Sequence, residues 1–280
     1  MSSYSSFAVI GAGTLGGPIL AALAAQPSAK VILLSRSAAK TVPANVKVVQ
    51  VPAYDDVPAV TAALKAHNVE VIVSTVTTEA IAAQSPLVDA AQKAGVKLFV
   101  PSEFGTSTEG HTEGPFGEKN KIIEKLQSVG VPYLRIFNGL FIEFATWTVN
   151  YNAEAKKLYV IGKSEGPVSA TSIGDVAGYL AHILTHQPSF ILANRILRIE
   201  GDRIPGYRSL GPLFGAKVET VEKLEGEMAD LKASLMSLAD QGLATTGCGV
   251  KGVSDEEASK SGNALWPEHQ WKTVKDVFGL

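Results

Sequence analysis

The sequence predicts an α/β fold built on a doubly wound parallel sheet, and two observations carry this prediction. Apolar stretches of strand type alternate with helical stretches along the amino-terminal part of the chain. The strand-like stretches are apolar almost throughout, which is typical of parallel strands covered by helices on both faces. Since ligands of such sheets bind beyond the carboxyl ends of the strands, we expect the functional residues along one rim. The predicted strands span residues 7–10, 30–36, 46–51, 69–76 and 96–100.

A glycine-rich turn follows the first strand and precedes an alanine- and leucine-rich stretch typical of a helix. Gly11 would allow the sharp turn, Gly13 would let a pyrophosphate approach the backbone, and Gly16 would let the helix pack against the strand. The helix start would offer unpaired N–H groups to an anion. The pattern also occurs in ordinary turns, but its position predicts a Rossmann-like dinucleotide site. The predicted contacts here are Gly11, Ala12, Gly13, Thr14, Leu15 and Gly16.

The end of the second strand predicts which dinucleotide binds. The adenosine ribose is expected about twenty residues after the glycines, where NAD sites usually carry an acidic residue. This strand ends instead in Ser35-Arg36-Ser37, with Lys40 nearby. A guanidinium suits a 2′-phosphate, so we predict NADP(H) as the cofactor. The alternative is that Arg36 is a solvated charge at a strand end.

Further motifs resemble those of a known family. They are Ala-Gly-Val-Lys-Leu-Phe-Val-Pro-Ser-Glu-Phe-Gly at 94–105, Val-Pro-Tyr at 131–133, Asn-Gly-Leu-Phe at 138–141, Thr-Ser-Ile-Gly-Asp-Val-Ala at 171–177 and Glu-Gly-Asp-Arg at 200–203. With the glycine turn and Arg36, they resemble the NmrA-like and isoflavone reductase-like branch of the atypical short-chain dehydrogenases/reductases, which includes phenylcoumaran benzylic ether reductase-type enzymes. The resemblance covers most of the first 205 residues.

The resemblance implies one NmrA-like unit over residues 1–280. A dinucleotide-binding core would span approximately 1–138 and 170–186. A smaller substrate-facing lobe would span approximately 139–169 and 187–280.

The resemblance also implies a catalytic lysine. In the isoflavone reductase-like enzymes, this lysine lies three residues before the first aliphatic residue of the helix predicted here at 118–128. Lys119 matches it when the segments are aligned back from residues 131–133, and Lys121 is the second choice. A solvated helix face is the alternative for either lysine. The arginine that often follows one turn later is replaced by Ile123.

An ordinary short-chain dehydrogenase would carry Tyr-x-x-x-Lys, but Pro115 stands four residues before Lys119. The proton donor would therefore be Lys119, a bound water or the substrate itself. The missing tyrosine also disfavours a relative of sugar-nucleotide epimerases.

Other predicted site residues follow the strands of the sheet. Aromatic side chains near residues 137–147 predict a wall for a flat apolar ligand, with an ordinary core as an equal alternative. The further cofactor contacts are Ser74, Thr75, Val76, Ser102, Phe104, Lys119 and Asn138. The predicted substrate pocket consists of Phe104, Phe137, Gly139, Phe141 and Phe144.

Composition narrows the class of protein. The net charge of −2 gives no basic face for nucleic acid or an anionic membrane. The single cysteine excludes an internal disulfide and favours a reducing compartment. No apolar run reaches the length of about eighteen residues needed for a membrane span, and residues 1–6 resemble neither a signal nor a transit peptide. We expect a cytoplasmic protein.

Two other classes of site have little support. His182 and His186 lie one helical turn apart, but no acidic or cysteine cluster accompanies them, so we predict no metal. No Gly-x-Ser-x-Gly elbow supports a hydrolase.

Together with the resemblance, these features imply an NADPH-dependent reductase. It would transfer a hydride to a flat apolar, aromatic small molecule, such as a phenylpropanoid-like, isoflavonoid-like or aryl carbonyl compound. The alternative is a non-catalytic NADP(H)-binding redox sensor of the NmrA type that acts through a protein partner. Under either function, the sequence is compatible with a homodimer and does not determine the oligomeric state.

Four local predictions complete the description. Residues 106–117 are expected to form a mobile loop, and Asp175 to cap a helix over 176–185. Residues 218–239 are expected to form one helix. Residues 241–262 are expected to be a loose surface segment or a lid, with a brief helix near 253–257.

Overall fold

The computed structural model describes residues 3–37 and 41–280, and a five-stranded parallel sheet organises its amino-terminal part. The strand order is β3-β2-β1-β4-β5, so the first strand is central. Residue Phe7 of β1 lies beside Val31 on one side and Val71 on the other. The predicted doubly wound parallel fold is confirmed. The strands are β1 (Ser6–Ile10), β2 (Lys30–Ser35), β3 (Val46–Gln50), β4 (Val71–Ser74) and β5 (Leu98–Val100).

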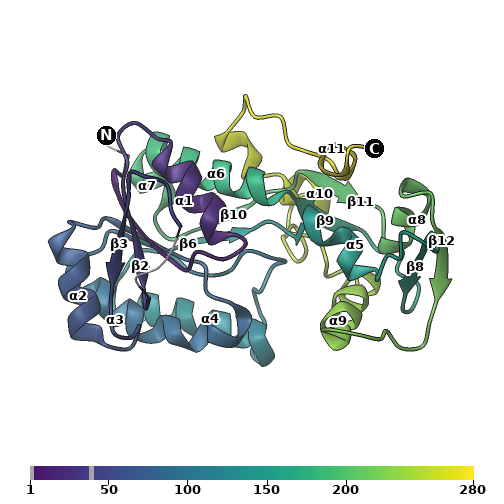
Figure 1. The fold of residues 1–280 in the computed structure, drawn as a ribbon, viewed down its shortest axis with the longest axis horizontal. Coiled ribbons are helices and arrows are strands. Elements are labelled where there is room, and N and C mark those ends of the chain that lie inside the picture. The colour runs from purple at the N-terminus through teal and green to yellow at the C-terminus, as the bar shows by residue number, and fades with distance from the viewer. Residues whose placement is uncertain (1–2, 38–40) are drawn as a thin grey trace. The chain divides into compact units, whose positions relative to one another are not determined.

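Helices cover both faces of this sheet (Figure 1), as its apolar strands require. One face packs against α2, α3 and α4, where Leu64, Leu87 and Leu126 join a common core with Ile10 and Ile72. The elements are α1 (Gly16–Ala24), α2 (Val57–Ala66), η1 (Thr78–Ala83), α3 (Gln84–Ala94), α4 (Gly114–Ser128), β6 (Leu134–Phe137), α6 (Ile173–His186), α7 (Ser189–Leu192) and β10 (Arg195–Arg198).

The chain divides into two compact units. The first comprises the residues up to Glu103, Thr108–Ile136 and Val176–Leu197, and the second comprises Phe104–Ser107, Phe137–Asp175 and Arg198–Leu280. Compared with the division expected from the sequence, the first unit also takes in residues 187–197 and leaves residues 104–107, 137–138 and 170–175 to the second.

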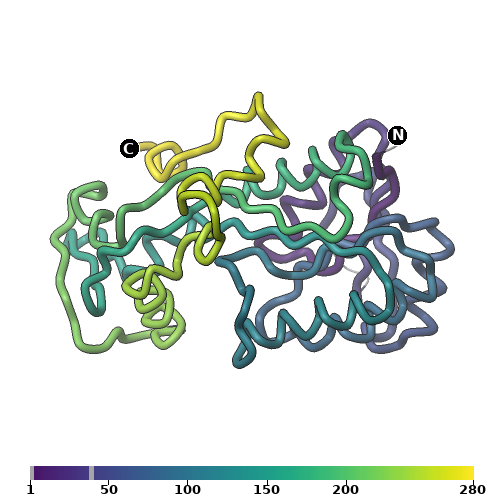
Figure 2. The backbone as a smooth tube through the Cα atoms, turned by 180° about the vertical axis from the view of Figure 1, so that it is seen from behind, coloured from purple at the N-terminus to yellow at the C-terminus, as the bar shows by residue number. Residues whose placement is uncertain are grey.

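The second unit contains two small sheets around its own core, with β9 central in the order β11-β9-β7 and β12 parallel to β8. The path of residues 198–280 can be followed in Figure 2. The elements of the second unit are β7 (Leu140–Phe141), η2 (Ile142–Phe144), α5 (Ala145–Thr148), β8 (Lys157–Val160), β9 (Val168–Thr171), β11 (Asp202–Ile204), η3 (Tyr207–Ser209), α8 (Leu210–Leu213), β12 (Lys217–Thr220), α9 (Ala229–Asp240), α10 (Asp255–Ser259), η4 (Asn263–Leu265) and α11 (Val274–Phe278).

The single helix predicted over 218–239 is wrong. Residues Lys217–Thr220 form β12 because Val218 and Thr220 are β-branched and β8 offers a partner edge. Gly226 then has a φ of +88°, a left-handed conformation that a helix cannot contain, so the helix α9 begins only after it.

Helix α4 begins at Gly114, four residues before the predicted start. Pro115 lies in its first turn, where a missing N–H costs no hydrogen bond. The Asn120 side chain donates to the carbonyls of Thr108 and His111, at 2.6 and 2.8 Å, and so fastens the preceding segment to the helix. The segment predicted as a mobile loop is therefore helical in its last part and tied down before it.

Asp175 lies inside the first turn of α6 and does not cap it, which corrects the prediction. The N–H of Asp175 donates to Ser172 Oγ at 3.0 Å, and the N–H of Ile173 donates to the Glu143 carboxylate. The buried Asp175 carboxylate instead accepts from the N–H of Lys272, at 2.8 Å, and bonds His269 Nε2 at 2.9 Å.

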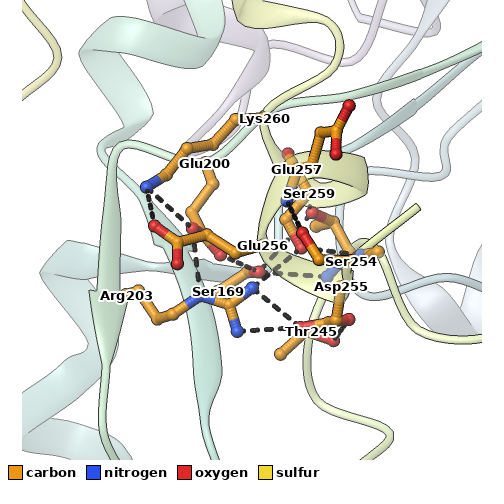
Figure 3. Close-up of polar contacts among 12 residues, drawn as sticks. Ser169, Glu200, Arg203, Thr245, Ser254, Asp255, Glu256, Glu257, Ser259 and Lys260 are labelled. Carbon is orange, nitrogen blue, oxygen red and sulfur yellow. Dashed lines mark hydrogen bonds and ion pairs between the residues drawn. The ribbon is translucent and has the colours of Figure 1, made fainter.

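Residues 241–262 are not a loose surface segment. Figure 3 shows part of this segment gathered around Glu200, a carboxylate that is 1% exposed. Arg203 bridges Glu200 at 3.3 Å and Asp255 at 2.7 Å, while Lys260 lies 3.8 Å from Glu200. The hydroxyl of buried Ser169 donates to Glu200. Polar side chains therefore hold this segment against the rest of the second unit, and the brief helix predicted in it is α10.

Within residues 3–37 and 41–280, no helix combines the length and the apolar character that a membrane crossing needs.

Candidate functional site

The turn between β1 and α1 needs glycine at two places and leaves room at a third. Gly11 has a φ of +94°, and a Cβ added to it would lie 2.8 Å from Thr75 Oγ1. A Cβ at Gly16 would lie 2.2 Å from the carbonyl oxygen of Gly11. At Gly13 no atom of residues 3–37 and 41–280 lies within 4 Å of such a Cβ, so a ligand can approach the backbone there.

Thr75 braces this turn from the neighbouring strand end. Its N–H donates to the Ile10 carbonyl at 2.8 Å, and its hydroxyl lies 3.0 and 3.2 Å from the carbonyl oxygens of Ile10 and Gly11. Ser74 is fully buried, and its hydroxyl has no hydrogen-bond partner among the described residues. The fourth strand thus holds the turn through Thr75, while Ser74 has no exposed surface.

The amino-terminal end of α1 has free donors. Hydrogen bonds from Gly17 to Gly13 and from Ile19 to Leu15 close its first turn. In the part of the chain that the structure describes, no residue accepts a hydrogen bond from the N–H groups of Gly13, Thr14 or Leu15. These N–H groups and the positive end of the helix dipole can bind an anionic group.

A groove of about 600 Å³ lies beside this turn in the first unit. It includes six of the predicted cofactor residues, while Thr14, Leu15 and Gly16 continue the turn into α1. Lys40 lies outside the described residues. The groove is lined by Gly11, Ala12, Gly13, Leu33, Leu34, Ser35, Arg36, Ser37, Tyr54, Thr75, Val76, Thr77, Ala80 and Ala83.

Arg36 is exposed in this groove and lies against Tyr54. Its Cζ is 5.4 Å from the centroid of the Tyr54 ring, and the Tyr54 hydroxyl donates to the Leu34 carbonyl at 3.3 Å. Burial raises the pKa of Tyr54, although the Arg36 guanidinium opposes this shift. The sequence analysis missed Tyr54, whose only signal was an aromatic residue following the third strand on the expected rim.

Lys119 and Lys121 on α4 have different surroundings. The ammonium of Lys119 donates to the backbone carbonyl of Glu103. Although the residue as a whole keeps intermediate exposure, desolvation of the ammonium lowers the pKa of Lys119; Glu103 opposes this shift and Arg135 adds to it. Lys121 is exposed and pairs with Glu118 at 2.6 Å, which raises its pKa. These surroundings favour Lys119 as the functional lysine.

Ser102 connects the loops that follow β4 and β5. Its hydroxyl donates to the Val76 carbonyl at 2.7 Å, and its N–H donates to the side chain of buried Gln84 at 2.9 Å. These contacts fix the loop that carries the neighbouring Glu103 carbonyl.

Asn138 and Gly139 are buried in the second unit. The N–H groups of both residues donate to the Gly105 carbonyl at 3.0 Å. Gly139 has a φ of +69°, and a Cβ there would lie 2.0 Å from the Ser169 carbonyl oxygen. The Asn138 side chain donates to the Gly139 carbonyl, whereas its own oxygen has no hydrogen-bond partner among the described residues.

The predicted aromatic wall is only partly exposed. Phe137 is fully buried and belongs to the core. Phe141 and Phe144 meet edge to face with centroids 6.0 Å apart, and Trp147 lies 6.0 Å beyond Phe144. Phe144 is 37% exposed, whereas Phe104 and Phe141 keep intermediate exposure. Phe104, Phe141 and Phe144 therefore each keep accessible surface, whereas Phe137 does not.

Known proteins share this fold and part of this sequence. The oxidoreductase aprR of Aspergillus flavus is 33% identical over 175 residues, which make up 59% of this chain and 58% of that protein. The match thus spans less than two thirds of the relative's length.

Two solved structures cover nearly the whole chain. The binary complex of leucoanthocyanidin reductase with NADPH from Vitis vinifera has a TM-score of 0.78 at 19% identity and covers 98% of both chains. Isoflavone reductase has a TM-score of 0.75 at 16% identity and also covers 98% of both chains. These structures have the same fold as this chain.

The family model described as the NmrA-like family matches residues 4–206, which include the glycine turn, Arg36 and Lys119. The resemblance expected from the motifs is confirmed, and the chain belongs to the NmrA-like family.

Proposed function

We propose that this protein is an NADPH-dependent reductase that transfers a hydride to a flat, apolar, aromatic small molecule. The observation that carries the proposal is the groove of the first unit, where the open Gly13, the free N–H groups of α1 and the exposed Arg36 lie along one rim. The relative from Aspergillus flavus is called an oxidoreductase, and the two solved structures are those of reductases.

The residues of the groove fit NADPH part by part. The backbone at Gly13 and the N-terminal N–H groups of α1 would bind the pyrophosphate, because among the described residues no atom lies within 4 Å of a Cβ placed at Gly13. The guanidinium of Arg36 would pair with the 2′-phosphate. NADPH, when bound, supplies the hydride.

Lys119 would supply the proton that accompanies reduction. A lysine with its ordinary pKa is a weak acid near neutral pH, but desolvation lowers the pKa of Lys119 and makes its ammonium a better donor. Its hydrogen bond to the Glu103 carbonyl keeps the ammonium in one place. Phe104, Phe141 and Phe144 would contact the aromatic substrate through their exposed surfaces.

Calorimetric titration with NADPH and NADH tests the cofactor part of the proposal. The wild-type chain is expected to prefer NADPH, and Arg36→Ala is expected to lose about 10- to 100-fold in NADPH affinity, the range for hydrogen bonds to charged groups. NADH affinity should change little. Arg195→Ala, which removes another exposed arginine of the first unit, is the matched control. Equal affinity for the two cofactors, or binding of neither, would refute this part.

Turnover tests the catalytic part. NADPH oxidation would be followed with aryl ether, enone and aryl aldehyde substrates, for the wild type, Lys119→Ala and the control Lys121→Ala. Activity should fall only in Lys119→Ala, while NADPH binding persists. Full activity of Lys119→Ala would remove the lysine from the mechanism. Tight NADP(H) binding with no oxidation by any substrate would favour the redox-sensing alternative.

A further inference from the structure

A buried ion pair lies next to the functional lysine in the first unit. Arg135 Nε lies 2.9 Å from Glu103 Oε1, and the two residues are 5% and 2% exposed. Arg135 comes from β6 and Glu103 from the loop after β5. Burying two charges is costly unless additional hydrogen bonds satisfy them, so the surroundings of this pair are informative.

Thr108 and Asn120 supply those hydrogen bonds. The Thr108 hydroxyl donates to the second carboxylate oxygen of Glu103 at 3.0 Å. Arg135 donates from one terminal nitrogen to the Thr108 hydroxyl and to the Asn120 side-chain oxygen, the latter at 2.7 Å. Asn120 is the residue after Lys119 on α4, so the network is anchored in the same helical turn as the lysine.

Glu103 connects this network to Lys119 directly. Its carboxylate is fixed by Arg135 and Thr108, while its own backbone carbonyl accepts the hydrogen bond from the Lys119 ammonium. From this arrangement we propose that the Glu103–Arg135 pair is a positioning device for Lys119, which places its ammonium and balances the charge around it. The inference rests on the proposed function and assigns Glu103 and Arg135 roles as positioning residues.

The two members of the pair act on Lys119 in opposite directions. The negative charge of Glu103 raises the pKa of Lys119, and the positive charge of Arg135 lowers it. Removing the charge of Glu103 should therefore lower the protonation midpoint of Lys119, and removing the charge of Arg135 should raise it. A merely structural network would not produce such a pair of shifts.

The test measures the protonation midpoint of Lys119 in the cofactor-free protein. The rate of acetylation by acetic anhydride would be followed against pH, with Lys119 and Lys121 read separately by mass spectrometry. The midpoint of the curve, unlike its amplitude, does not depend on how accessible the amine is. Exposed Lys121 serves as the internal reference in the same sample.

Glu103→Gln keeps the shape of the side chain and is expected to shift the Lys119 midpoint to lower pH. Arg135→Gln is expected to shift it to higher pH. Asp89→Asn is the matched control, because it breaks the 2.7 Å ion pair between Asp89 on α3 and Lys125, which lies on the same helix as Lys119. This variant should leave the Lys119 midpoint unchanged. Midpoints that do not move, or that move in the same direction in both variants, would overturn the inference.

Arg135→Gln leaves a buried carboxylate without its partner and could unfold the chain. In that case Arg135→Lys is used in place of Arg135→Gln, because a lysine keeps the positive charge. The Lys119 midpoint should then stay near the wild-type value, and the melting temperature should be lower. A midpoint in Arg135→Lys that rises well above the wild-type value would contradict charge balance. Since labelling needs neither NADPH nor substrate, failure of this inference is distinguishable from failure of the proposed reductase activity.

Discussion

The guanidinium of Arg36 lies over the ring of Tyr54, with its Cζ 5.4 Å from the ring centroid. Both side chains line the groove of the first unit, and the Tyr54 hydroxyl is tied to the Leu34 carbonyl. The ring therefore limits the orientations of an otherwise exposed arginine.

Replacing Tyr54 with alanine should weaken NADPH binding more than NADH binding. A cation–π contact at an exposed site contributes about 0.5–1 kcal/mol, so NADPH affinity should fall about two- to fivefold. Tyr54→Phe keeps the ring and should bind NADPH nearly as well as the wild type. Calorimetry with both cofactors checks this, and an equal loss for NADH would mean that the ring contacts the shared part of the nucleotide.

Alanine at Gly13 and at Gly16 should have different effects. A Cβ at Gly16 meets the Gly11 carbonyl oxygen at 2.2 Å, so Gly16→Ala should lower the free energy of unfolding by about 1–3 kcal/mol. A Cβ at Gly13 meets no atom of the described residues within 4 Å, so Gly13→Ala should fold normally but lose NADPH affinity. Urea unfolding and calorimetry separate the two effects. Normal NADPH binding by Gly13→Ala would show that no cofactor group approaches this residue.

Glu200 should make stability depend on pH in a specific direction. Burial raises its pKa above the ordinary value of 4.5, although Ser169, Arg203 and Lys260 oppose the shift. A carboxyl whose pKa is raised in the folded state contributes its full stabilisation at pH values below its unfolded pKa. This contribution is lost as pH rises through the folded pKa. The free energy of unfolding of the wild type, relative to Glu200→Gln, should therefore decrease as pH rises from 4.5.

Urea unfolding of both proteins over this pH range checks the expectation. Glu165→Gln removes an exposed carboxyl of the same unit and serves as the matched control. A relative stability of the wild type that increases with pH would contradict a raised pKa at Glu200.

Asp175 should hold residues 269–272 in place. Its carboxylate bonds the His269 ring and the Lys272 N–H, and the His269 ring stacks on Trp266 with centroids 3.7 Å apart. Asp175→Ala should cost about 1–3 kcal/mol in the free energy of unfolding, because two donors lose their buried, charged acceptor. Hydrogen exchange should accelerate near residue 272.

Glu268→Ala is the matched control for this prediction, since Glu268 is exposed beside His269. It should leave hydrogen exchange unchanged. Unaltered exchange near residue 272 in Asp175→Ala would show that the stacked aromatic side chains hold the segment without the carboxylate.

Local patterns were sufficient to predict the first sheet and its turn. The strands are apolar almost throughout, and Gly11, Gly13 and Gly16 follow the first of them at fixed spacing, so neighbouring residues alone define strand, turn and helix. Lys119 was proposed by alignment to a family motif and stays a prediction, because a helical lysine in isolation is indistinguishable from a solvated one.

Contacts between distant parts of the chain escaped the sequence analysis. The acceptor role of Asp175 depends on residues 94 and 97 positions further along the chain. The strand character of Lys217–Thr220 depends on its pairing with β8. Arg135 looked like an ordinary strand residue until its partner Glu103, 32 positions away, was placed beside it.

The interleaving of the second unit has a consequence for folding during synthesis. All five strands of the first sheet lie within residues 6–100, so they can pair early as the chain leaves the ribosome. Ser169 and Glu200 are buried by residues 244–260, which are translated later. Until then, the half-finished second unit displays the Glu200 carboxylate and the Ser169 hydroxyl, which belong in its interior, so we expect this part of the nascent polypeptide to be the last to become stable.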